Sequence, residues 1–299
     1  MDPKLRGIYT ALVTPFSSTG EIDWKSLDRL LSFQLNASVS GLVVCGTTGE
    51  TPTLSLDEKK TLTERVLEKA KETSEVIVGT GSNSTKSTLE MSTWAKEKGA
   101  DALLVVVPYY NKPTQSGLYA HFVEVAKAVS PLPIILYDVP GRTGVSLSLE
   151  TIFKLGSECP NIVGIKDATG SVTRITEIRA LLGEHFSILS GDDPIYFPSA
   201  CLGANGVISV ASNVAPKEMV AIHNALTLNH YQEARALHNQ LFPLFRDLFI
   251  ESNPTPCKWI LTYIGVIESE TVRKPLAPLS AENQIQLKIT LEKTLGITK

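Results

Sequence analysis

The sequence contains few of the residues that mark metal sites, disulfide scaffolds or nucleic-acid surfaces. Its 299 residues include four cysteines and five histidines, and neither type occurs at metal-ligand spacing or as a C-x-x-C pair. The net charge is −3, so no basic surface for nucleic acid is indicated. We therefore expect reduced cysteines, no metal and no nucleic-acid partner.

Long apolar segments are also missing. The longest strand-like apolar run, residues 102–107, is far too short to span a bilayer, and the polar N-terminus lacks the layout of a signal peptide. With 43% apolar and 20% charged residues, the composition is ordinary for a soluble globular protein. We expect a cytoplasmic protein without a membrane partner.

The chain does contain a regular alternation of short apolar runs and helical patterns. Eight runs predict strands at residues 8–13, 41–45, 76–79, 102–107, 134–137, 162–166, 187–190 and 206–209. The segments between them predict helices at 23–35, 56–71, 85–98, 115–129, 148–155, 172–182, 195–201 and 216–226. Eight strand–helix repeats predict an α/β fold of the (β/α)₈ TIM-barrel type over residues 1–226.

Two further structural expectations complete the outline. A doubly wound open sheet is the alternative, but the glycines at 79 and 81 lack the third glycine of a dinucleotide-binding turn. Beyond residue 226 the alternation stops, and helical patterns at 230–250, 256–264 and 281–295 predict a small helical C-terminal domain over residues 227–299.

The sixth run ends in a lysine, Lys166, after the apolar residues 162–165. Burial at the mouth of a core disfavours a charged ammonium, and a neutral amine is a nucleophile that forms Schiff bases with carbonyl substrates. The alternative is a structural ion pair of Lys166 with Asp167 or another carboxylate.

Other polar groups follow the remaining strands, where the active site of such a barrel lies. None is a histidine, so proton transfer would fall to tyrosine, threonine or lysine. The turn at 46–49 contains Thr47 and Thr48 and can present N–H groups and hydroxyls to a small anion. Arg142 offers a planar fork for a second carboxylate. A glycine turn or a strand-end tyrosine is, taken alone, more often structural.

The anion is predicted to be a carboxylate rather than a phosphate. In TIM barrels a phosphate usually binds at the loops after the last two strands. Here those loops contain Asp192 and Asp193 and no lysine or arginine.

Several motifs resemble those of the 4-hydroxy-tetrahydrodipicolinate synthase (dihydrodipicolinate synthase) family, in the pyruvate-dependent class I lyase and aldolase superfamily. The resemblance runs essentially end to end and includes 46–50 (GTTGE), 108–111 (PYYN), 137–144 (YDVPGRTG), 164–167 (GIKD), 190–192 (SGD) and 253–259 (NPTPCKW). Sialic-acid lyases are also similar, but the threonine pair and Arg142 favour the synthases.

The resemblance implies a role for each matching residue. Lys166 would form the Schiff base with pyruvate, and Tyr137 would donate and accept protons, connected through Thr47 to Tyr110. The implied substrate-binding residues are Thr48, which would bind the pyruvate carboxylate, Ile208 with a main-chain contact, Gly191, and Arg142, which would hold the carboxylate of aspartate semialdehyde. No cofactor is implied beyond the covalent lysine–pyruvate adduct.

The resemblance also implies an oligomer. In the family Tyr110 would reach into the neighbouring subunit, so a homodimer would complete the site, and a homotetramer is expected. Lysine inhibits many family members in a cleft at this interface. The positions that commonly hold the inhibitor are Leu56, Lys59 and Ser87 here, so we expect weak inhibition or none.

Two alternatives remain open at this level. One is a sister aldolase that joins pyruvate to a sugar-acid aldehyde through the same lysine chemistry. The other is a non-catalytic barrel with a sensing or structural role.

Overall fold

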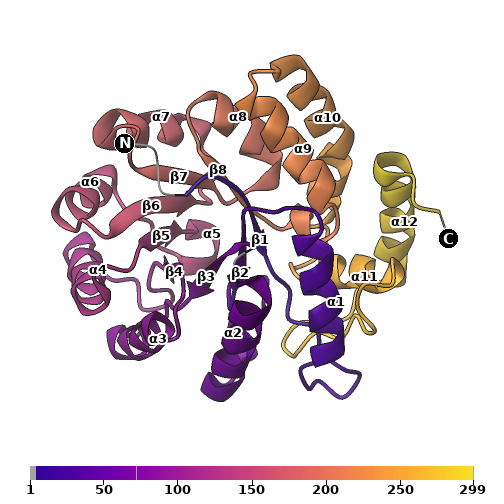
Figure 1. The fold of residues 1–299 in the computed structure, drawn as a ribbon, viewed down its shortest axis with the longest axis horizontal. Coiled ribbons are helices and arrows are strands. Elements are labelled where there is room, and N and C mark those ends of the chain that lie inside the picture. The colour runs from indigo at the N-terminus through magenta and orange to yellow at the C-terminus, as the bar shows by residue number, and fades with distance from the viewer. Residues whose placement is uncertain (1–4, 72, 299) are drawn as a thin grey trace. The chain divides into compact units, whose positions relative to one another are not determined.

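The computed structural model describes residues 5–71 and 73–298, and in these residues eight parallel strands form a closed barrel in sequence order (Figure 1). The strands are β1 (Gly7–Ala11), β2 (Gly41–Val44), β3 (Glu75–Gly79), β4 (Ala102–Val106), β5 (Ile134–Asp138), β6 (Ile162–Asp167), β7 (Ser187–Ser190) and β8 (Gly206–Ser209). Each predicted strand is confirmed, with ends that differ by at most two residues. The doubly wound alternative is wrong, because a closed barrel has no free sheet edge.

Helices follow the strands as the alternation predicts. They are α1 (Trp24–Leu35), α2 (Leu56–Ala70), α3 (Thr85–Glu97), α4 (Gln115–Val129), α6 (Leu149–Glu158), α7 (Val172–Leu182), α8 (Tyr196–Cys201) and α9 (Pro216–Thr227). Ser55 caps α2: its hydroxyl accepts from the Glu58 N–H and the Glu58 carboxylate accepts from the Ser55 N–H, which together form a capping box.

Four short helices were not predicted from the sequence. They are η1 (Thr51–Thr53), α5 (Pro140–Thr143), η2 (Asp193–Ile195) and η3 (Ala211–Asn213). In α5, Pro140 occupies the first helical position and Gly144 ends the helix with a φ of 72°. Four residues carry too little periodicity to be recognised as a helix.

The strands appear in the sequence as continuous apolar runs because both of their faces are buried. Every residue of β1, β2, β5, β6, β7 and β8 is buried. Strands of a parallel barrel pack side chains inward on one face and against helices on the other, so polar residues are few before the strand ends.

The chain divides into two compact units, which we describe separately. The first comprises Met1–Gly7 and Glu75–Ile208, and the second Ile8–Ser74 and Ser209–Lys299. The first unit therefore carries β3 to β7 and most of β8, with α3 to α8. The second carries most of β1, β2 and all helices after β8.

The C-terminal helices belong to the second unit. They are α10 (Tyr231–Asp247), α11 (Thr255–Tyr263) and α12 (Ala281–Leu295), as the helical patterns predict. Helix α10 packs against α9 and α12, and α11 contacts α12 and η3. A domain boundary between residues 226 and 227 stays a prediction.

Candidate active site

Lys166 and Tyr137 lie side by side in the first unit. The pairing of β5 with β6 places Tyr137 directly opposite Lys166, and the Lys166 Nζ lies 4.1 Å from the centroid of the tyrosine ring. Both residues are only 6% exposed. The alternative partner of Lys166, Asp167, is instead paired with Arg174 at 2.8 Å. The structure thus brings together the predicted nucleophile and the predicted proton carrier.

Gly191 leaves the space that the Lys166 side chain occupies. A Cβ atom at residue 191 would lie 2.7 Å from the Ala168 Cβ and 3.1 Å from the Lys166 Cε. The Gly191 N–H donates to the Asp167 carbonyl at 2.7 Å, which ties the loop after β7 to the end of β6. Ile208, in β8, is 1% exposed. Ile208 is therefore part of the barrel core.

Tyr110, on a loop, and Arg142, in the short helix α5, belong to the same unit and are both more exposed than Lys166 and Tyr137. Tyr110 is 88% exposed and has a φ of 73°. Its N–H donates to the Thr143 carbonyl at 3.4 Å, so its backbone is anchored to α5. Arg142 is exposed in α5, the short helix after β5.

In the second unit, the loop after β2 holds Thr48 buried and bonded. Thr48 is 3% exposed, and its Oγ1 accepts from the Asn253 Nδ2 at 2.9 Å. The Gly49 carbonyl accepts from the Thr14 hydroxyl at 2.7 Å. Thr47 is partly exposed. These two hydrogen bonds hold the loop after β2 in place.

A buried ion pair, which sequence reasoning missed, fixes the end of this loop. The Lys258 Nζ lies 2.6 Å from the Glu50 Oε1 and 2.6 Å from the Thr271 carbonyl. Burial lowers the pKa of Lys258 to about 8, although Glu50 opposes the shift. Lys258 is therefore a structural lysine rather than a second nucleophile. Its only sequence signal was its place in the 253–259 motif.

Other candidate chemistries find no support in the described residues. Cys45 is fully buried, and burial raises the pKa of its thiol to about 11, so it is not an activated nucleophile. Across residues 5–71 and 73–298, no cluster of histidine, cysteine and acidic side chains could hold a metal ion. Within the same ranges, no helix is both long and apolar enough to cross a bilayer.

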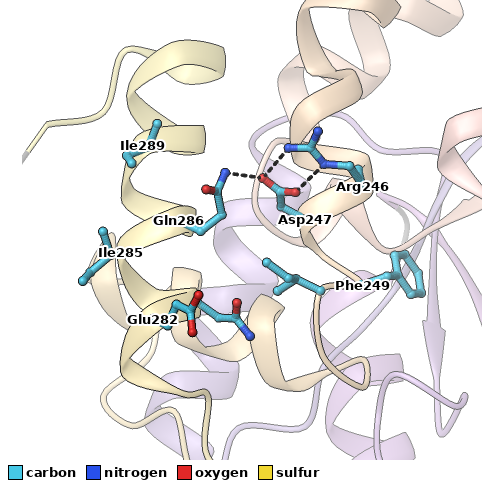
Figure 2. Close-up of a pocket in the computed structure, with 9 residues that line it drawn as sticks. Arg246, Asp247, Phe249, Glu282, Ile285, Gln286 and Ile289 are labelled. Carbon is cyan, nitrogen blue, oxygen red and sulfur yellow. Dashed lines mark hydrogen bonds and ion pairs between the residues drawn. The ribbon is translucent and has the colours of Figure 1, made fainter.

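A hollow between α10 and α12 contains none of the predicted site residues (Figure 2). Its volume is about 600 Å³, and Ile285 and Ile289 are exposed along it. Asp247 accepts from the Arg246 Nε at 2.6 Å and from the Gln286 Nε2 at 3.2 Å, as Figure 2 shows. These polar groups satisfy one another and connect the two helices, so the hollow is structural.

Fold and site together define a class of protein. A buried lysine beside a tyrosine at the strand ends of a (β/α)₈ barrel is typical of enzymes that form Schiff bases with carbonyl substrates, the lyases and aldolases. The sequence model of the Dihydrodipicolinate synthetase family matches residues 4–294, and the chain belongs to that family. It is thus a lyase.

Relatives with known names agree with this membership. The 4-hydroxy-tetrahydrodipicolinate synthase of Aquifex aeolicus is 46% identical over 288 residues, covering 96% of this chain and 97% of that protein. The solved synthase of Methylacidiphilum fumariolicum superposes with a TM-score of 0.95 at 44% identity, covering 98% of this chain and 97% of that one. The synthase of Cyanidioschyzon merolae, solved with lysine bound, has a TM-score of 0.95 at 37% identity, covering 98% and 99%.

Proposed function

We propose that this chain catalyses the reaction for which its relatives are named: the condensation of pyruvate with L-aspartate 4-semialdehyde to 4-hydroxy-tetrahydrodipicolinate, in lysine and diaminopimelate biosynthesis. The observation that carries the proposal is the buried Lys166 beside Tyr137, in a family member 46% identical to a named synthase. The sister aldolase and the non-catalytic barrel are not favoured by these findings.

In the proposed mechanism, the Lys166 amine attacks the ketone carbon of pyruvate. Water leaves and a Schiff base forms, with Tyr137 donating the proton that the leaving oxygen needs and later accepting one from the methyl carbon. The resulting enamine attacks the aldehyde carbon of the second substrate. The amine of that substrate then displaces Lys166, which closes the ring and frees the enzyme without a separate cofactor.

The remaining roles follow the chemistry of each side chain. Thr48 binds the pyruvate carboxylate through its hydroxyl and N–H, and Gly191 and the main chain of Ile208 border the bound pyruvate. Thr47 connects Tyr137 to Tyr110 in a proton relay. Arg142 forms two parallel hydrogen bonds with the carboxylate of aspartate semialdehyde, because its planar fork fits that geometry.

We also propose that the working form is a homodimer, assembled further into a homotetramer, in the cytoplasm. The 88% exposure of Tyr110 supports this, since a proton relay needs a tyrosine shielded from bulk water. A neighbouring subunit would supply that shielding. The four free cysteines fit a reducing compartment.

The test is to trap the intermediate. Borohydride with pyruvate should give a stable adduct that peptide mass mapping assigns to Lys166, and Lys166→Ala should give none, while Lys258→Ala should still form it if folded. A coupled assay with pyruvate and a panel of aldehydes should show aspartate semialdehyde as the preferred partner. An unmodified parent chain would refute the lysine chemistry, and a preference for a sugar-acid aldehyde would favour the sister aldolase.

A further inference from the structure

A cluster of two carboxylates and one guanidinium lies directly behind Tyr137 and Lys166. In the pairing of β5 with β6, Asp138 lies opposite Asp167, just as Tyr137 lies opposite Lys166. Because side chains alternate along a strand, the two aspartates point to the other face of the sheet. There they meet Arg174, from the first turn of α7.

Arg174 contacts both strands and the loop between β5 and α6. Its Nη2 donates to the Asp138 Oδ2 at 2.7 Å and to the Leu147 carbonyl at 2.8 Å. Its Nε lies 2.8 Å from the Asp167 Oδ2, an ion pair without the alignment of a hydrogen bond. The arginine side chain is 15% exposed, and the two aspartate side chains are at most 1% exposed.

Asp138 extends this cluster to the segment that follows Arg142. Its Oδ2 also accepts from the Ser146 hydroxyl at 2.7 Å and from the Leu147 N–H at 3.1 Å. The Asp167 Oδ1 accepts from the N–H and hydroxyl of Thr169 at 3.0 and 2.6 Å. The cluster therefore joins the ends of β5 and β6 to the segment Ser146–Leu147, which follows the short helix that contains Arg142.

Arg174 supplies the positive charge that offsets one of the two negative charges of the cluster. Burial raises the pKa of Asp138 and the facing Asp167 adds to this, while Ser146, Arg174 and the Leu147 N–H oppose the rise. The Asp138 Oδ1 is buried and has no hydrogen-bond partner among the described residues. Without the guanidinium, two buried carboxylates would face each other across neighbouring strand ends, where like charges repel strongly.

We propose that Arg174 is a positioning residue for the reaction: by bridging Asp138 and Asp167, it holds the ends of β5 and β6 at the spacing at which Tyr137 can exchange protons with the adduct on Lys166. Arg174 acts on the opposite face of these strands and does not touch the reacting atoms. The inference rests on the proposed function, because it assigns Arg174 a part in that same chemistry.

The test compares the pH dependence of the parent with that of Arg174→Gln. The charged groups of the cluster are Asp138 from β5, Asp167 from β6 and Arg174 from α7, with Lys166 on the other face of β6. At pH 8.5, kcat and the rate of borohydride trapping of Arg174→Gln should fall on the order of 10²-fold relative to the parent, because the guanidinium no longer bridges the two facing carboxylates and a misplaced group can cost that much. At pH 6 the loss should be smaller, because burial raises the pKa of Asp138 and the repulsion between the two carboxylates weakens as the pH falls.

A second variant isolates the electrostatic cause. Arg174→Gln combined with Asp138→Asn removes one negative charge at nearly constant shape, so the pH slope should disappear and the rate at pH 8.5 should recover by about tenfold or more relative to Arg174→Gln. If Arg174→Gln does not fold, Arg174→Lys serves in its place. Its single ammonium cannot bridge both carboxylates in the way that the planar fork does, and we expect a partial loss of kcat.

Arg179→Gln is the matched control on the same helix. Arg179 is also largely buried, but it donates to the backbone carbonyls of Phe186 and Gly203 at 2.9 and 2.6 Å rather than to strand-end carboxylates. It should lower the thermal midpoint and leave the pH profile of kcat as in the parent.

These outcomes distinguish a failure of the proposed function from a failure of the positioning role of Arg174. If the parent forms no pyruvate adduct on Lys166, the proposed function fails. If the parent forms the adduct, and the folded Arg174 variants keep the parent's kcat and pH profile, the positioning role is refuted while the function stands. A uniform loss at all pH values that Asp138→Asn does not relieve also refutes it, because it would show a purely structural role.

Discussion

At the scale of single residues, Tyr137 is the group whose role depends most on chemistry rather than packing. Tyr137→Phe keeps the ring beside Lys166 and removes only the hydroxyl. We expect kcat to fall on the order of 10²-fold or more, the usual scale for one general acid–base group. Tyr119→Phe is the control, because its hydroxyl bonds Glu158 on the surface. Activity within a few-fold of the parent would show that another group carries the protons.

Arg142 is expected to distinguish the two substrates. Arg142→Ala should raise the KM for aspartate semialdehyde by about 10- to 100-fold, since a hydrogen bond to a charged group contributes about 1.5–3 kcal/mol. The KM for pyruvate should change little, because Thr48 is assigned to that carboxylate. Arg142→Lys should give an intermediate loss, as it keeps the charge and loses the fork. Equal rises in both KM values would indicate a structural role.

At the scale of elements, the ion pair at the start of α2 couples stability to pH. The guanidinium of Arg273 donates to both carboxylate oxygens of Glu58, at 2.9 and 2.5 Å, and holds the pKa of Glu58 at about 2. A carboxyl with a depressed pKa stabilises the fold above its ordinary pKa of 4.5, and that contribution is lost as pH falls towards 2.

Glu58→Gln tests this coupling. The amide can retain the capping box, so the variant loses mainly the charge. The free energy of unfolding should fall by about 1–3 kcal/mol at pH 7, after allowing for partial exposure, and the difference should vanish between pH 4.5 and 2. Asp57→Asn, exposed in the same turn, should change it by less than about 0.5 kcal/mol. A difference independent of pH would contradict the ion-pair explanation.

At the scale of the whole molecule, subunit mixing tests whether the site is shared. Tyr110→Phe subunits, with reduced activity alone, and Lys166→Ala subunits, inactive alone, should regain activity in mixed dimers, because one of the two sites then contains both groups. The parent homodimer gives the reference activity. No gain in mixtures shown to contain mixed dimers would place both groups in the same subunit.

Inhibition by lysine is the second prediction at this scale. The positions that commonly hold the inhibitor in the family are Leu56, Lys59 and Ser87 here. Lys59 adds a positive charge against the ligand's ammonium, and at 4 Å like charges repel by about 1 kcal/mol even in water. We expect little inhibition when lysine is titrated at fixed pyruvate. Half-inhibition below about 1 mM, an affinity of about −4 kcal/mol or better, would contradict this and indicate other groups, such as Glu90.

The sequence by itself determined the barrel and its reactive lysine. Strands and helices differ in hydrophobic period, and each strand–helix unit is local in sequence, so the pattern alone predicted all eight strands. Lys166 was identifiable from the sequence because burying a charged side chain at the end of an apolar strand costs free energy, so such a residue usually has a specific role. Short α5 escaped prediction, because four residues do not show a period.

Only the tertiary structure decided what supports these groups. Asn253 bonds Thr48 across 205 positions, Lys258 pairs with Glu50 across 208, and Arg174 bridges two strands from a helix 36 residues beyond Asp138. No local pattern encodes such partners, because a buried charge is satisfied by whichever group packing brings to it. Asp167 thus pairs with Arg174 and not with the adjacent Lys166, because the side chains of neighbouring residues in a strand point to opposite faces of the sheet.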